Sequence, residues 1–120
     1  MSYTGWEILN RNELLKIFPA QYNEIKAHHI THIFGGDELP DECTAMIIGI
    51  SDDYCGLQVM VVSINGEILR PDGKIYHCTW SLLPGRNPVE SNSVIANHSW
   101  IPISPPIEMS VCPKGFYILT

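Results

Sequence analysis

The sequence contains few basic residues, and this deficit excludes one large class of function. Seven lysines and arginines stand against thirteen aspartates and glutamates, which gives a formal net charge of −6. Proteins that grip a long stretch of nucleic acid need a basic stripe that replaces the counterions along the phosphates. We therefore expect no extended nucleic-acid groove. A small anionic ligand stays compatible with this charge, because a few well-placed donors bind one phosphate.

Long apolar runs and paired cysteines are also lacking. No run approaches the roughly 20 apolar residues that span a bilayer, and the start, MSYTGWEIL, has neither the basic nor the apolar region of a secretory signal. The cysteines at positions 43, 55, 78 and 112 form no C-x-x-C pair, which is typical of free thiols in a reducing compartment. We expect a cytoplasmic protein without membrane association, in the host cytoplasm if the chain is viral.

Apolar segments that favour β-strands are frequent. One domain is expected over residues 1–120, because this length suits a single hydrophobic core. Strands are predicted over residues 4–9, 27–34, 44–50, 57–64 and 74–82, with a two-residue turn at residues 65–66 and a last hairpin over 107–119. Short helical segments are predicted over residues 13–18 and 91–96. This pattern predicts an α+β fold with one or two short helices.

Three histidines lie within five positions, in the stretch HHITHIF. Structural zinc prefers Cys and His pairs two to four residues apart, at two places in the chain. No paired cysteines accompany these histidines, and a strand sends His28 and His29 to opposite faces. We predict no metal site and no cofactor, and we expect His28 and His32 to point away from the His29 face as structural or surface residues. His98 has no motif around it and is expected on the surface or in a loop.

A second stretch repeats part of this pattern. Residues 76–82 read YHCTWSL, so the order His-x-Thr occurs at His77 and Thr79 as well as at His29 and Thr31. Glycine follows each copy within a few residues, and period-two alternation puts each histidine and its threonine on one face of the strand. Chance is the alternative explanation, because five histidines in a chain of this composition produce such pairs at random.

Two histidines that face each other, each with a threonine, suit the cleavage of a phosphodiester. In-line displacement needs a base for the attacking oxygen and an acid for the leaving oxygen. An unperturbed pKa near 6.5 lets histidine take either role at neutral pH. His29 and His77 are therefore the candidate catalytic residues, and Thr31 and Thr79 are candidate donors to the non-bridging phosphate oxygens. The sequence leaves open which histidine is the base.

The stretch HCTWSLLPGRNPVESN, residues 77–92, resembles the second motif of the cyclic phosphodiesterase domains in fungal-type tRNA ligases and small phage relatives. These domains belong to the 2H phosphoesterase superfamily. In them a His-x-Thr strand is followed by a glycine and by a Pro-Val-x-Ser-Asn segment, which here spans residues 88–92. The present chain is short for the family, and His32 and Trp80 stand where many members carry an aliphatic residue.

The resemblance implies a compact two-lobed fold in which antiparallel sheets flank a central cleft and each lobe brings one His-x-Thr strand to it. It implies a metal-independent hydrolase whose acid/base pair is His29 and His77. The substrate would be a cyclic phosphodiester in a small nucleotide: a 2′,3′-cyclic phosphate, free or at an RNA terminus, or a cyclic oligonucleotide. One alternative is a protein that sequesters a cyclic nucleotide without turnover and so counteracts host antiviral signalling. A host-interaction protein with chance motifs is another.

Further residues are candidates for substrate binding. Aromatic stacking holds a base without a basic groove, so Tyr3 and Trp6 are candidate platforms, although aromatic residues are more often part of the core. Ser81 continues the face of the second motif. Ser91 and Asn92 are candidates for the substrate loop, with helix capping as the alternative role. Oligomeric state is not indicated. The basic residues that stand as candidates for phosphate charge are Lys26, Lys74 and Arg86.

Overall fold

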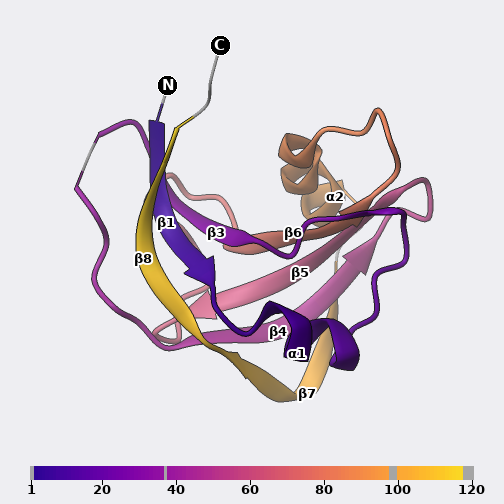
Figure 1. The fold of residues 1–120 in the computed structure, drawn as a ribbon, viewed down its shortest axis with the longest axis horizontal. Coiled ribbons are helices and arrows are strands. Elements are labelled where there is room, and N and C mark those ends of the chain that lie inside the picture. The colour runs from indigo at the N-terminus through magenta and orange to yellow at the C-terminus, as the bar shows by residue number, and fades with distance from the viewer. Residues whose placement is uncertain (1, 37, 98–99, 118–120) are drawn as a thin grey trace.

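The computed structural model describes residues 2–36, 38–97 and 100–117, which fold into two antiparallel sheets with two short helices (Figure 1). The larger sheet has five strands in the order β2-β6-β5-β4-β7, and the smaller has three in the order β3-β1-β8. The predicted α+β class, with antiparallel sheets and short helices, is confirmed.

The elements have the following bounds. The strands of the five-stranded sheet are β2 (Glu24–Ile25), β6 (His77–Leu82), β5 (Leu57–Ile64), β4 (Ala45–Asp52) and β7 (Ile101–Met109). Those of the three-stranded sheet are β3 (His29–Phe34), β1 (Ser2–Ile8) and β8 (Val111–Tyr117). The helices are α1 (Arg11–Ile17) and α2 (Ser91–Asn97), the second preceded by a 3₁₀ turn over Pro88–Glu90. Within the described ranges, no helix has the length and apolarity that crossing a bilayer requires.

Strand β5 lies at the centre of the molecule and is buried along its whole length. Met60 and Val62 face the core between the two sheets, whereas Val59 and Val61 face a second cluster beneath α2. Because both faces of the strand are covered, its sequence is continuously apolar and does not alternate. Full burial of each such side chain contributes about 1.5–3 kcal/mol. Strand β5 therefore fixes the position of its neighbour β6.

The chain passes from one sheet to the other just before the first His-x-Thr motif. The N–H groups of Lys26 and Ala27 donate to the carbonyls of Trp80 and Thr79 at 2.9 and 3.0 Å, which extends the pairing of β2 with β6. Ala27 has a φ of 48°, and from His29 onward the chain pairs with β1 instead. Strand β3 consequently starts beside β6 (Figure 1).

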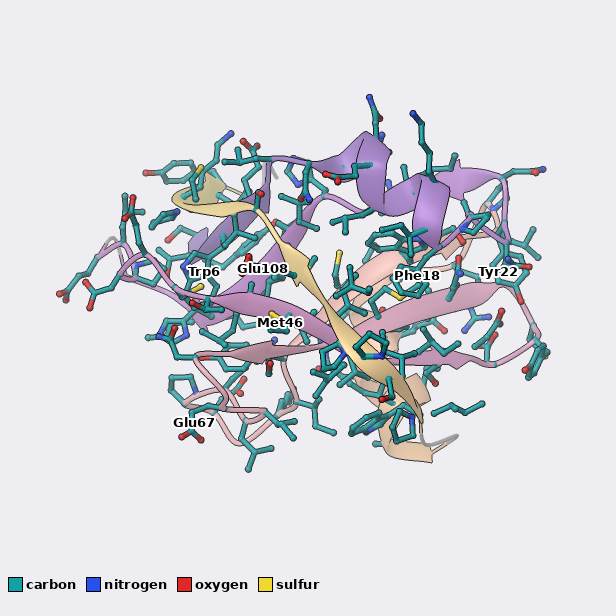
Figure 2. The ribbon with its side chains drawn as sticks, turned by 90° about the horizontal axis from the view of Figure 1, so that it is seen from below. Trp6, Phe18, Tyr22, Met46, Glu67 and Glu108 are labelled. Carbon is teal, nitrogen blue, oxygen red and sulfur yellow. The ribbon has the colours of Figure 1, made fainter. Side chains whose placement is uncertain are left out.

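The chain passes between the sheets again at Ser110, and this corrects the hairpin predicted over 107–119. Strand β7 pairs with β4, and β8 pairs with β1. Pro113 lies within β8 opposite Trp6, where an edge strand tolerates the missing N–H. The turn-like composition around Pro113 is thus overridden by pairing with a distant strand, and residue 119 is outside the described residues. Figure 2 labels Met46 and Glu108, register partners on β4 and β7.

Both His-x-Thr strands carry a β-bulge at the same place in the motif. In β3 the pairing with β1 skips His32, the residue after Thr31. In β6 the pairing with β5 skips Trp80, the residue after Thr79. A bulge of one residue reverses the alternation of faces beyond it. The two strands therefore share a local irregularity as well as a sequence pattern.

Candidate active site

The two His-x-Thr motifs line one pocket. His29 and Thr31 reach it from β3 of the small sheet, and His77 and Thr79 reach it from β6 of the large sheet. The pocket has a volume of about 760 Å³. Its four motif residues come together because the chain changes sheets at Ala27, directly before the first motif.

His77 is oriented by the backbone. Its Nδ1 lies 2.9 Å from the carbonyl oxygen of Ile75, and a carbonyl only accepts, so Nδ1–H is the donor and Nε2 is left for the pocket. Burial lowers the pKa of His77, and the hydrogen bond to Ile75 opposes this shift. The positive charge of Arg70 lowers that pKa further.

The surroundings of His29 shift its pKa strongly. Burial, followed by the charges of His28 and His77, lowers the pKa of His29 to about 4. A proton on His77 thus disfavours a second proton on His29. His29 is therefore neutral at neutral pH.

The hydroxyl of Thr79 is held by a neighbour at the start of α2. Its Oγ1 lies 2.7 Å from Ser91 Oγ and 3.4 Å from the carbonyl of Pro88. Ser91 is fully buried, so the prediction that it binds substrate is corrected: it orients Thr79. The side chain that caps the N-terminus of the preceding 3₁₀ turn is Asn87, which accepts from the Val89 N–H at 3.0 Å.

Asn92 and Tyr3 lie on the pocket wall, as expected. The Asn92 Nδ2 donates to Val89 at 3.3 Å, while its Oδ1 is buried and has no partner among the described residues. Tyr3 stacks on Phe116 with ring centroids 5.0 Å apart. Phe34, which sequence reasoning missed, joins Tyr3 at 5.7 Å and also lines the pocket. The bulge at residue 32 turns Phe34 to this face, and strict alternation hides it.

Ser81 does not reach the pocket, which corrects the prediction for this residue. The bulge at Trp80 turns it to the opposite face, where it is completely buried. Its hydroxyl donates to Gln58 Oε1 at 2.6 Å and accepts from the N–H groups of Gln21 and Tyr22, both at 3.2 Å. Ser81 therefore holds the loop that leads into β2.

Trp6 is also corrected, because it is a core residue with 2% of its surface exposed. Its Nε1 donates to the carbonyl of Asp41 at 2.9 Å. It borders a different hollow of about 630 Å³, which it shares with His32 and Tyr76. Figure 2 shows Trp6 toward one end of the molecule and Phe18 toward the other. A substrate in the histidine pocket does not stack on Trp6.

Of the remaining described histidines, His32 lies as expected and His28 does not. His32 points away from the His29 face, as expected, and its Nδ1 lies 2.7 Å from the hydroxyl of Tyr76. His28 does not behave as expected, because it lines the pocket and its Nδ1 lies 3.0 Å from His29 Nδ1. It precedes the strand and follows the left-handed Ala27, so strand alternation does not govern it. The prediction for His98 lies outside the described residues.

Three basic residues line the pocket: Arg11, Lys26 and Arg70. Arg70 was not identified from sequence, since no motif surrounds it. It is 4% exposed, and its guanidinium binds Asp72 through two hydrogen bonds of 3.1 and 2.7 Å. Lys74 is absent from the wall. Arg86 binds Asp53 at 2.7 Å and is likewise absent from it.

The four cysteines form no disulfide, and the described residues form no metal-binding cluster. All four cysteines are free thiols. Across the described part of the chain, no group of three or more His, Cys, Asp or Glu side chains is arranged to hold a metal ion.

Comparisons of the chain with protein-family models, curated proteins and solved structures give no match. The functional argument therefore rests on the geometry of the pocket.

Proposed function

We propose that this chain is a metal-independent phosphodiesterase of the 2H type, which hydrolyses a cyclic phosphodiester in a small nucleotide. One observation carries the proposal: His29, Thr31, His77 and Thr79 come from two different sheets and line the same pocket. Two histidines with purely structural roles would not be expected to line the same open pocket, each with a threonine hydroxyl two residues along its strand.

The reaction divides between the two histidines. One imidazole removes a proton from water, or from a ribose hydroxyl in a transfer step, as the oxygen attacks phosphorus. The bond from phosphorus to the leaving oxygen breaks, and that oxygen takes the proton of the other imidazole. The hydroxyls of Thr31 and Thr79 donate to the non-bridging oxygens, where charge develops. The anionic phosphate raises both histidine pKa values toward the range in which they exchange protons at neutral pH.

The rest of the pocket suits a small nucleotide. A volume of about 760 Å³ lies in the usual range for small-ligand sites. Tyr3 and Phe34 offer ring faces on which a base stacks, and Arg11, Lys26 and Arg70 supply positive charge. The substrate class is a 2′,3′-cyclic phosphate, free or at an RNA end, or a cyclic oligonucleotide. The free thiols agree with action in the reducing cytoplasm.

The test is a substrate panel. Cyclic mono-, di- and trinucleotides, and an RNA ending in a 2′,3′-cyclic phosphate, are incubated with the protein with and without chelator, and products are detected by mass. We expect a product heavier by one water, unaffected by chelator, and a rate about 10²–10⁴-fold lower in His29→Ala or His77→Ala. Activity that survives loss of either histidine, or that needs a divalent metal, contradicts the proposal. Binding without product would instead identify a sequestering protein.

A further inference from the structure

His28 contacts the ring of His29 on one side and the carboxylate of Glu7 on the other. Its Nδ1 lies 3.0 Å from His29 Nδ1, and its Nε2 lies 3.5 Å from Glu7 Oε2. Glu7 is the cross-strand register partner of His29 on β1. Its carboxylate also accepts from Lys114 Nζ at 2.8 Å.

Proton positions follow from what each group can donate. A carboxylate accepts only, so Glu7 favours the form of His28 that carries hydrogen on Nε2. A neutral imidazole with hydrogen on Nε2 has its lone pair on Nδ1, and His28 then accepts from His29. With His28 in this neutral form, the Nδ1 of His29 carries the hydrogen, which leaves its Nε2 with a lone pair.

We propose that Glu7 and His28 are positioning residues that hold His29 in the tautomer with hydrogen on Nδ1 and a free Nε2 lone pair. The catalytic purpose of this positioning rests on the proposed function. His77 is held in the same tautomer by a different acceptor, the backbone carbonyl of Ile75. The two imidazoles are thus oriented alike, one by the main chain and one by the relay of Glu7 and His28.

The tautomers are measurable without any substrate. Long-range proton–nitrogen NMR correlation on the unliganded protein distinguishes protonated from unprotonated ring nitrogens. We expect hydrogen on Nδ1 of His29 and on Nε2 of His28. A His29 ring with hydrogen on Nε2 overturns the inference, whatever the activity. The expected tautomers with no activity on the panel would count against the proposed function alone.

Two substitutions of His28 separate orientation from packing. Asparagine keeps an amide oxygen near the position of Nδ1, whereas alanine removes the acceptor. We expect His28→Ala to give mixed His29 tautomers and to lower kcat about 10–100-fold, the usual cost of losing a group that orients a functional histidine, with KM little changed. His28→Asn should restore most of the rate and the wild-type tautomer. Equal rates in the two variants, or an unchanged His29 tautomer in His28→Ala, overturns the inference.

Lys114 provides the matched control for Glu7. Both Glu7→Ala and Lys114→Met remove the Glu7–Lys114 ion pair, but only the first removes the acceptor for His28. We expect Glu7→Ala to shift His28 toward the other tautomer and to lower kcat, and Lys114→Met to leave both unchanged. Equal effects of the two changes assign the loss to the ion pair and overturn the role of Glu7. The NMR measurement on the wild-type protein decides the question if a variant does not fold.

Discussion

His29 and His77 share a pocket but differ in the groups that surround them. Burial and two neighbouring imidazoles lower the pKa of His29 to about 4, whereas the Ile75 carbonyl partly offsets the effect of burial on the pKa of His77. A general acid has to arrive protonated and a general base unprotonated. Under the proposed function, the lowered pKa of His29 suits the role of base, which two copies of one motif leave undefined.

The threonine hydroxyls make a separate prediction. Thr79→Val keeps the volume of the side chain but removes the donor, and we expect kcat to fall about 10²–10³-fold if the hydroxyl stabilises the developing charge. Ser91→Ala leaves Thr79 in place without its 2.7 Å partner and should have a smaller effect. Ser81→Ala is the control, because Ser81 lies on the same strand but faces away. Steady-state kinetics of the three variants would contradict this role if Thr79→Val and Ser81→Ala behaved alike.

The four motif residues of the pocket, together with Tyr3 and Asn92, could be predicted from sequence, whereas Phe34, Arg70 and the placement of His28 could not. The four residues of the His-x-Thr pairs share a wall because a strand repeats its faces with a period of two. Ser81 was assigned to the wrong face and Phe34 was not identified, because a bulge leaves no reliable mark in one sequence. Arg70 reaches the pocket from a turn paired to Asp72, and no local pattern indicates that placement.

At the scale of the elements, the close contact between the backbones of β1 and β3 determines the position of the first motif. Gly5 lies opposite Thr31, and a Cβ on Gly5 would overlap the carbonyl of Ile30. Only glycine lets the two backbones approach this closely beside the bulge. The register of β3, and with it the placement of His29, depends on this one residue.

Gly5→Ala should therefore destabilise the protein by about 2–4 kcal/mol, since backbone on backbone cannot relax cheaply. Gly115→Ala is the matched control: Gly115 pairs with Thr4 on the other side of β1, and a Cβ there meets only Leu39 at 3.7 Å. We expect the control to change stability by less than about 1 kcal/mol. Urea unfolding monitored by tryptophan fluorescence compares the two, and similar losses in both variants would show that the close approach is unimportant.

Element prediction succeeded where the signal was local. The buried run over residues 57–64 and the turn at Asn65-Gly66 are confirmed, the turn with φ values of 50° and 83°. The hairpin over 107–119 is wrong because the partner of each segment is a distant strand. The change of sheet at Ala27 was not predicted for the same reason, because it depends on pairing with β1, a strand distant in sequence.

At the scale of the molecule, the lowered histidine pKa values make stability depend on pH. His29 has a pKa of about 4 when folded and near 6.5 when unfolded, so between these values the unfolded state binds more protons. The free energy of unfolding must fall as pH drops through this window. At a pH of about 5, the change in the pKa of His29 lowers the free energy of unfolding by about 2 kcal/mol relative to high pH.

Urea unfolding at about pH 7.5 and about pH 5 measures this effect. Wild-type protein should lose more stability than His29→Asn over the interval, because the variant lacks the group that takes up the proton. The carboxylates of Asp53 and Asp72 have lowered pKa values, so they titrate below the interval and do not interfere. Identical pH dependence in the two proteins would place the His29 pKa near its ordinary value.

The order of the strands also has a consequence for synthesis on the ribosome. Strand β1 emerges early, yet one of its two partners is β8, with Ser2 opposite Tyr117. Until residues 111–117 have left the exit tunnel, β1 and β3 make at most a two-stranded ribbon, which is marginally stable in water. The nascent polypeptide therefore cannot hold His29 in place during translation, and the pocket is complete only when the late strand docks.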